Sequence, residues 1–237
     1  MQTVHIVNAY DQDLKFLAHR IAAMGGLAER MVDQAVQALV HQDVGLAEKV
    51  VADDQALDEG QREIDDKAIV IIARRQPMAE DLRAIIGAIR ISSDLERVGD
   101  LGKNIAKRVL SVSDGRQPVS LFRGIEALAQ LALTQLKEVL DAYATRSVER
   151  IGFVRDRDHD IDAMYTSLFR ELLTYMMEDP RNITACTHLL FCAKNIERIG
   201  DHATNIAETV YYIVTGEQMP LERPKEDRSH KVVLGVD

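Results

Sequence analysis

The chain has 237 residues, of which 46% are hydrophobic, and its formal net charge at pH 7 is -9. This length and apolar content suffice for one large globular domain or two smaller ones. The negative charge repels a phosphate backbone, so we expect no nucleic-acid partner. The N-terminus lacks the basic and apolar regions of a signal peptide, and no window approaches the roughly 18 apolar residues of a membrane span. We therefore expect a cytoplasmic protein without direct membrane insertion.

The positions of proline and glycine predict an all-α protein with long helices. Leu, Ala, Ile, Val, Glu and Arg carry most of the sequence, a composition that favours helix. Because helices end at prolines and glycine-containing turns, we expect six helices, over residues 9–43, 46–75, 78–112, 118–145, 148–178 and 181–215. The expected breaks lie near Gly45, Pro77, Asp114-Gly115-Pro118, Ser147 and Asp179-Pro180.

The first expected helix carries an apolar stripe typical of a helical bundle. Steps of three and four residues place six apolar side chains on one face: Ile21, Met24, Leu27, Met31, Ala35 and Leu39. After Gly216 the chain becomes polar and is twice interrupted by proline. We expect residues 218–237 to form a mobile tail.

An internal repeat divides the chain into two similar halves. Residues 94–106 read DLERVGDLGKNIA and residues 195–207 read NIERIGDHATNIA, so five polar or glycine positions recur at an offset of 101 residues. A period near 100 residues is too long for a solenoid and suits a duplicated three-helix bundle. We therefore expect two tandem, structurally similar three-helix bundles, over residues 1–114 and 115–217.

Acidic residues occupy the repeated positions. On a helix, Glu96 and Asp100 project from one face one turn apart, and Asn104 continues the row. The second copy repeats this spacing with Glu197, Asp201 and Asn205.

Two further acids in each half fall level with these rows. If the second and third helices form an antiparallel hairpin about Pro77, Asp58 lies level with Glu96, and Asp54 lies level with Asp100. The same construction about Asp179-Pro180 pairs Asp162 with Glu197 and Asp158 with Asp201. Gathered carboxylates repel one another, so a cation is expected between them.

A metal ion is one candidate for that cation. Carboxylates without thiolates form a hard-oxygen site suited to iron, manganese, magnesium or calcium, and also to zinc. We predict eight ligands: Asp54, Asp58, Glu96, Asp100, Asp158, Asp162, Glu197 and Asp201. Asn104 and Asn205 are candidates for additional ligands, or for residues that hydrogen-bond a neighbouring helix.

Basic side chains are the alternative. Arg97, Arg198 and Lys103 could neutralise the acids as surface salt bridges of small energetic value. Lys103 lies almost on the face of Glu96, and its repeat counterpart is Thr204, which carries no charge. We expect Arg97 and Arg198 to point away from the adjacent glutamates and to pair with other acids, such as Asp94 and Asp201.

The repeated glycines also need an explanation. Gly99 and Gly200 each cost a helix about 1 kcal/mol relative to alanine. We expect them to permit close approach of a neighbouring backbone or a ligand.

Histidine and cysteine do not point to metal or redox chemistry. His159 and His202 lie beside the acids, but no Glu-x-x-His pair of a di-iron oxidase bundle occurs, and we expect both rings to be solvated. Cys186 and Cys192 fit neither a disulfide framework nor a zinc motif, so we expect buried free thiols.

These stretches resemble the PhoU family of bacterial regulators of phosphate uptake. The resemblance rests on IIARRQPMAEDLRAIIGAIRISSDLERVGDLGKNIAKR and on FCAKNIERIGDHATNIAETVYYIVTGE, and it extends over residues 9–217. It implies two similar three-helix bundles and a paired acidic motif at the eight positions named above. It also implies multinuclear metal clusters, of iron or zinc first, with manganese or magnesium as further candidates.

The resemblance further implies a non-enzymatic role in signalling. Members restrain the phosphate-starvation response by contacting the ATPase subunit of the phosphate-specific ABC transporter and the sensor histidine kinase of the phosphate two-component system. A homodimer is expected. Taken without the resemblance, the residues also allow a carboxylate-bridged metalloenzyme, either a hydrolase or an oxidase, which turnover of phosphoesters or oxygen would reveal.

Overall fold

The computed structural model describes residues 2–112 and 119–220, and within these ranges the chain is helical, without strands. The elements in chain order are α1 (Gln2–His41), α2 (Val44–Arg75), α3 (Ala79–Val112), α4 (Val119–Thr145), α5 (Val148–Glu178), the short 3-10 helix η1 (Pro180–Asn182) and α6 (Ile183–Thr215). The all-α prediction is confirmed. None of the helices in the described ranges is both long and apolar enough to cross a membrane.

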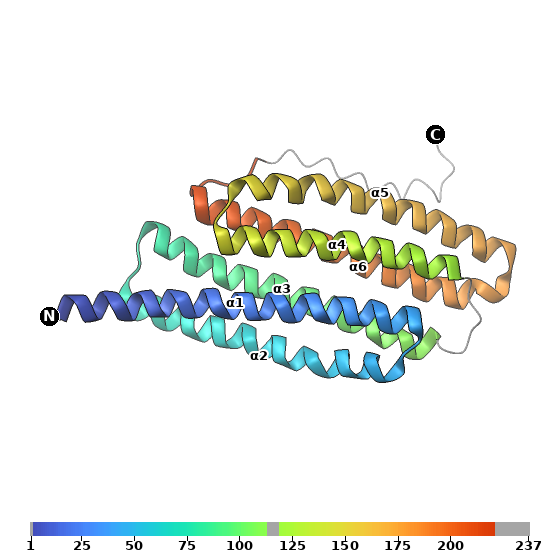
Figure 1. The fold of residues 1–237 in the computed structure, drawn as a ribbon, viewed down its shortest axis with the longest axis horizontal. Helices are drawn as coiled ribbons and strands as arrows, with labels where there is room; N and C mark the ends of the chain where they lie inside the picture. Colours follow the sequence, from blue (N-terminus) through green and yellow to red (C-terminus); the bar gives the residue numbers. More distant parts are fainter. Residues whose placement is uncertain (1, 113–118, 221–237) are drawn as a thin grey trace.

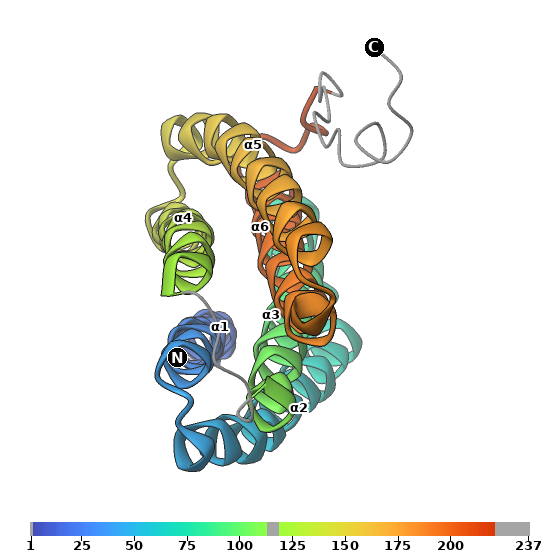
Figure 2. The same cartoon turned by 90° about the vertical axis from the view of Figure 1, so that its right-hand side faces the viewer.

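The helices form two three-helix bundles that pack along their length. Helices α1, α2 and α3 contact one another, as do α4, α5 and α6, and the two groups meet through α3 with α6 and α1 with α4. In Figure 1 all six long helices run close to the long axis of the molecule. In Figure 2, α2, α3, α6 and α5 follow one another in a curved layer, with α1 and α4 side by side on its concave side. The helices that carry the repeated acidic motifs, α3 and α6, are therefore neighbours at the centre of the molecule.

The start of α1 and its connection to α2 differ from the sequence-based prediction. Helix α1 begins at Gln2 rather than at residue 9, since neither proline nor glycine interrupts its first turns. The break between α1 and α2 lies at Gln42, with a φ of 54°, and Asp43, not at Gly45. The Asp43 carboxylate accepts a hydrogen bond from the backbone N–H of Leu46 at 2.9 Å and so caps α2. Gly45 lies inside the first turn of α2.

The two hairpins that align the acids turn where the prolines predicted. Gln76, with a φ of 48°, ends α2 and donates its N–H to the carbonyl of Ile72, directly before Pro77. In the second half, Asp179 ends α5 and accepts a hydrogen bond from the N–H of Arg181, and Pro180 opens η1. The expected break at residues 114–118 and most of the expected tail, residues 221–237, lie outside the described residues.

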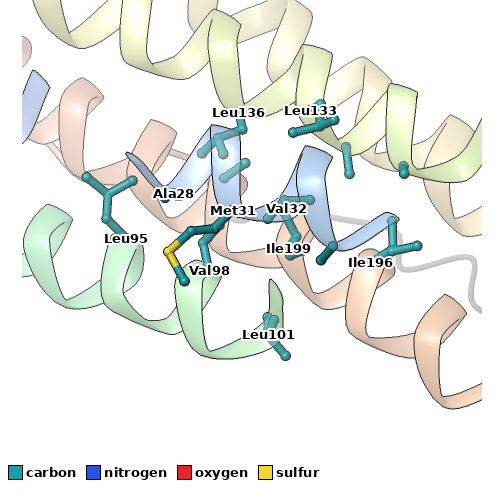
Figure 3. Packing of buried hydrophobic residues seen from close by; sticks show 14 of the residues in the cluster. Ala28, Met31, Val32, Leu95, Val98, Leu101, Leu133, Leu136, Ile196 and Ile199 are labelled. Carbon is teal, nitrogen blue, oxygen red and sulfur yellow. The ribbon is translucent and has the colours of Figure 1, made fainter. Parts of the chain in front are cut away.

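A continuous apolar core joins the two bundles. Figure 3 shows side chains of four helices meeting there, with Met31 and Val32 from α1, Leu95 and Val98 from α3, Leu133 and Leu136 from α4, and Ile196 and Ile199 from α6. Five residues of the predicted α1 stripe are buried, and the sixth, Leu27, is partly buried against the core. Because one core serves both bundles, we expect them to unfold together.

The thiols are part of this core. Cys186 and Cys192 are free and buried, as predicted. They occupy the repeat positions of Ile85 and Ile91, which are fully buried in the first half. Burial raises the pKa of Cys192 to about 12, against the opposing charge of Arg108, so this thiol remains protonated near neutral pH.

Candidate functional site

The first carboxylate cluster lies where α2 and α3 run antiparallel. Asp54 of α2 and Asp100 of α3 both accept hydrogen bonds from the ammonium group of Lys103, at Nζ to oxygen distances of 2.5 and 2.6 Å. One ammonium group therefore joins the two helices. This places Asp54 beside Asp100, in the register that the hairpin about Pro77 predicts.

Glu96 and Asp58 complete this cluster, and the acids act on one another. Burial raises the pKa of Glu96, and the negative charges of Asp100, Asp58 and Asp54 add to this rise, while the positive charge of Arg97 opposes it. The Oε2 atom of Glu96 is buried without a hydrogen-bond partner, although the Arg97 Nε lies 3.3 Å away. The four acids are thus close enough for their charges to repel.

Lys103 compensates part of this repulsion. Burial alone would lower the pKa of its ammonium group, but hydrogen bonds to Asp100 and Asp54 and attraction to their charges outweigh burial and raise the pKa. Only 20% of the Lys103 side chain is exposed. A charged ammonium group therefore lies within the first cluster.

The second carboxylate cluster is formed by α5 and α6. The Glu197 side chain is only 6% exposed, and its Oε1 accepts a hydrogen bond from the Lys194 ammonium group at 2.8 Å. Its Oε2 is buried without a hydrogen-bond partner. Burial raises the pKa of Glu197, Lys194 opposes this rise, and the charges of Asp201 and Asp162 reinforce it. Glu197, Asp201 and Asp162 are therefore electrostatically coupled, as their counterparts are in the first half.

Thr204, at the repeat position of Lys103, contacts the fourth acid. Its hydroxyl Oγ1 lies 3.1 Å from Asp158 Oδ1 and accepts a hydrogen bond from Gln135 Nε2 at 3.2 Å. Gln135 is fully buried on α4 and also donates to the backbone carbonyl of Val154 at 2.9 Å. A threonine hydroxyl therefore contacts Asp158 at the repeat position of the ammonium group that contacts Asp54. Sequence reasoning missed Gln135, because a single glutamine among apolar residues gives no periodic pattern.

The repeated glycines set the distance between the helices at both clusters. A Cβ atom on Gly99 would lie 2.1 Å from Leu57 Cδ1, and one on Gly200 would lie 3.0 Å from Ile161 Cδ1. Leu57 and Ile161 are equivalent residues of α2 and α5, one residue before Asp58 and Asp162. The expected close approach is confirmed, and the neighbour is in each case an aliphatic side chain.

Several neighbours of the acids differ from prediction. Arg97 does not point away from the cluster, because its guanidinium group lies 3.1 Å from Asp100 and 3.3 Å from Glu96. Arg198 is exposed. His159 is exposed as expected, but His202 is not solvated, since its Nδ1 lies 2.8 Å from Asp94 Oδ1 across the junction of the bundles.

The two asparagines have different surroundings. Asn205 donates to Asp94 Oδ1 at the long distance of 3.5 Å, so it bridges α6 and α3, whereas Asn104 is exposed. Hydrogen bonding to a neighbouring helix was one of the two roles predicted for Asn205, and that role is observed. For Asn104, the role as an additional ligand stays a prediction.

The donor atoms of both clusters are oxygens that fit a cation. Within residues 2–112 and 119–220, no three Asp, Glu, His or Cys side chains are arranged to hold a metal ion. In the first cluster, oxygens of Asp54 and Asp100 are directed at Lys103, so this donor set fits an ammonium group. A buried glutamate oxygen without a hydrogen-bond partner occurs in both clusters, Glu96 Oε2 in the first and Glu197 Oε2 in the second, and such hard-oxygen donors suit the metals named above.

Comparison with known proteins matches both halves of the chain. Residues 21–109 and 125–210 each match the family described as PhoU domain. A phosphate-specific transport system accessory protein PhoU homolog of Rhizobium meliloti is 66% identical, over 96% of this chain and 96% of that protein. A homolog of the same description from Caulobacter vibrioides is 50% identical, over 95% of this chain and 98% of that protein.

Solved structures show the same fold. PhoU from Pseudomonas aeruginosa superposes with a TM-score of 0.82 at 38% identity, and the match covers 88% of this chain and 100% of that one. The phosphate transport system regulatory protein PhoU from Streptococcus pneumoniae also gives a TM-score of 0.82, at 29% identity, covering 90% of this chain and 100% of that one. The family match, the identity and the shared fold agree: the chain belongs to the PhoU family.

Proposed function

We propose that this chain is an accessory protein of phosphate-specific transport that restrains phosphate uptake and the phosphate-starvation response when phosphate is plentiful. The observation that carries the proposal is the 66% identity, over 96% of both chains, to a protein named as an accessory protein of the phosphate-specific transport system. A relative that aligns at this level along its length shares the fold, so its named role is the basis for the role proposed for this chain.

The proposed mode of action is that of a cytoplasmic, dimeric adaptor without catalytic activity. It contacts the ATPase subunit of the phosphate-specific ABC transporter and the sensor histidine kinase. An adaptor shifts a transporter between states only if it binds those states unequally. The net charge of -9 favours basic patches on both partners, which speeds encounter at low salt.

We further propose that the carboxylate clusters bind metal, with iron or zinc first and manganese or magnesium as further candidates. The support is the gathering of four acids in the first half and of Glu197, Asp201 and Asp162 in the second, together with a buried, unpartnered glutamate oxygen in each half. Metal analysis of protein purified without chelator or metal-affinity resin tests this, with the variant Asp162→Asn/Glu197→Gln as control. Equal metal content in the two proteins would remove the second cluster from the proposal.

A deletion strain tests the regulatory role. In phosphate-rich medium, we expect the strain to express phosphate-starvation genes, and a plasmid copy of the wild-type gene to restore repression. Normal repression in the deletion strain would contradict the proposal.

Binding measurements test the adaptor role directly. Interferometry with the purified transporter ATPase and with the kinase is expected to show binding that weakens as salt rises, and ATPase binding that changes with added nucleotide. Binding that is indifferent to both conditions would contradict an electrostatically guided adaptor. Turnover of phosphoesters or oxygen by the metal-loaded protein would favour the metalloenzyme alternative.

A further inference from the structure

We propose that Gln135 of α4 is a positioning residue of the second carboxylate cluster. Its amide group sets the direction of the Thr204 hydroxyl, and this hydroxyl helps to hold the Asp158 carboxylate in the place from which it contacts a bound cation. The inference rests on the metal binding proposed for the second cluster, and it assigns to that cluster a supporting residue on a third helix.

The Gln135 amide joins the three helices of the second bundle. Its side chain is fully buried on α4, and its Nε2 donates to the backbone carbonyl of Val154 on α5 at 2.9 Å. The same nitrogen donates to the Thr204 hydroxyl of α6 at 3.2 Å. An amide nitrogen has two hydrogens, so these two bonds use its full donor capacity. Contacts to two different helices therefore fix the orientation of the amide.

The bond from Gln135 restricts what the Thr204 hydroxyl can do. A threonine on a helix has two accessible χ1 rotamers, and a bond from the amide to Oγ1 selects between them. The single hydroxyl hydrogen cannot point at the amide that donates to Oγ1, so it goes to Asp158 Oδ1 at 3.1 Å or to the carbonyl of Gly200 at 3.2 Å. The carboxylate is the stronger acceptor because it is charged. Gln135 therefore supports the bond from Thr204 to Asp158.

Packing alone does not account for a glutamine at this place. Its Oε1 is buried without a hydrogen-bond partner, a cost that an apolar side chain of similar size would avoid. In the first half, the fully buried Met31 of α1 lies near the repeated glycine, Gly99, as Gln135 lies near Gly200. A methionine therefore fills the comparable space without an amide, and the hydrogen bonds that Gln135 donates distinguish the second half.

The glycine of the second motif leaves room for this amide. A Cβ atom on Gly200 would lie only 3.1 Å from Gln135 Oε1. A larger residue at Gly200 would press on the amide and move it relative to Thr204. The glycine, the glutamine and the threonine therefore form one packed unit behind Asp158, which is the kind of support that keeps the position of a metal ligand constant.

A manganese titration of full-length, chelator-treated protein tests the proposal. The reference protein carries Asp58→Asn/Glu96→Gln, which disables the first cluster and leaves the second to bind Mn²⁺. Loss of the free Mn²⁺ signal in electron paramagnetic resonance counts bound ions and gives their affinity. The decisive variant adds Gln135→Met, which keeps the length of the side chain and removes the amide. Gln130→Met is the matched control, because Gln130 is an exposed glutamine of α4 whose amide reaches a threonine hydroxyl on its own helix, that of Thr134.

We expect Gln135→Met to weaken Mn²⁺ binding about 10-fold, the lower end of the effect of residues that support metal ligands, and Gln130→Met to match the reference protein. Thr204→Val should weaken binding at least as much, whereas Thr204→Ser keeps the hydroxyl and should retain the reference affinity. Because Gln135 acts through Thr204, adding Gln135→Met to Thr204→Val should cause no further loss.

These readouts separate positioning from a purely structural role. A structural role would lower stability in Gln135→Met and leave the Mn²⁺ affinity unchanged, and that result would overturn the proposal. A full further loss of affinity when Gln135→Met is added to Thr204→Val would also overturn it, since the two residues would then act independently. If circular dichroism shows that Gln135→Met is unfolded, Gln135→Leu replaces the amide by another apolar side chain, and the same loss of affinity is expected.

A second measurement distinguishes this inference from the metal proposal on which it rests. A reference protein that binds no Mn²⁺ would contradict metal binding by the second cluster. Urea denaturation in chelator would then decide the link between Gln135 and Thr204, through Gln135→Met, Thr204→Val and the double variant. Losses of stability that are smaller in combination than in sum would support the link, and additive losses would overturn it.

Discussion

The two carboxylate clusters occupy equivalent places in the two bundles, but different neighbours compensate their charge. In the first cluster, a mostly buried ammonium group from Lys103 lies between Asp54 and Asp100. In the second, the equivalent Thr204 offers Asp158 a neutral hydroxyl that Gln135 supports from α4. The acids recur in both halves, whereas Thr204 stands in the second half at the repeat position of Lys103.

The first helix of each bundle, α1 or α4, also differs where it meets the cluster. Met31 of α1 and Gln135 of α4 both face the repeated glycine, at 3.7 Å and 3.1 Å from the position of a Cβ atom. The neighbour of the repeated glycine from the first helix of each bundle is therefore apolar in the first half and polar in the second. An acidic motif alone thus does not determine the charge of the site that it forms.

The largest effect on stability is expected from Lys103→Met. The change keeps the apolar stem of the side chain and removes the cation between Asp54 and Asp100, so in the presence of chelator it should reduce the free energy of unfolding by about 2–3 kcal/mol. Urea denaturation measures this. Lys107→Met, on the exposed face of α3, should change stability by less than about 0.5 kcal/mol. Equal effects of the two changes would mean that Lys103 does not balance the cluster.

The next largest effect on stability is expected from alanine substitutions of the two repeated glycines, and it should differ between the halves. Gly99→Ala places a Cβ atom 2.1 Å from the fully buried Leu57, and its overpacking should outweigh the gain in helix propensity, for a net loss of about 1–2 kcal/mol. Gly200→Ala meets its neighbours at 3.0 and 3.1 Å and should change stability by less than about 1 kcal/mol. Thermal unfolding compares the two. A larger loss from Gly200→Ala would contradict the tighter approach at the first cluster.

A smaller effect is expected from Thr204→Val. This change removes the hydroxyl that contacts Asp158 and Gln135, and in chelator it should cost about 1.5 kcal/mol, the lower end of the range for a hydrogen bond to a charged group. Chemical denaturation of this variant and of Lys103→Met, side by side, compares the contributions of Thr204 and Lys103 to the free energy of unfolding. If the threonine change were the more damaging of the two, the proposed difference between the clusters would be wrong.

The smallest effect is expected at the junction between the bundles. Asp94→Ala removes the carboxylate that meets His202 and Asn205 of α6, and should cost about 0.5–1 kcal/mol, since these side chains remain partly hydrated. Because one core joins the bundles, a single unfolding transition should persist in this variant. Two separate transitions in calorimetry would show that the halves depend on this contact to unfold together.

Much of the fold follows from short-range rules in the sequence. Proline positions predicted both hairpins, and the 101-residue repeat predicted two similar bundles, because hairpin geometry and helix periodicity depend on residues close in the chain. The α1 stripe from Ile21 to Leu39 likewise predicted the core. The predicted start of α1 was wrong because it was placed just before the apolar pattern begins. The first eight residues contain no helix breaker, which is a weaker indication of helix than an apolar stripe.

The surroundings of the acids were harder to predict. His202 and Asn205 contact Asp94 because α3 packs against α6, and neither the repeat nor the hairpin register specifies how two bundles meet. Arg97 was expected to point away from Glu96, but its long side chain folds back along α3 to reach Glu96 and Asp100. Long flexible side chains select partners by local electrostatics, which helix periodicity does not describe.

The unequal compensation of the two clusters is tested most directly by a crystal structure of the chelator-treated protein soaked in Mn²⁺, with anomalous diffraction to locate the ion. We expect an anomalous peak at Glu197 in the second cluster, and Lys103 Nζ still between Asp54 and Asp100 in the first. Peaks of equal height in both clusters, with Lys103 turned out into solvent, would contradict the account.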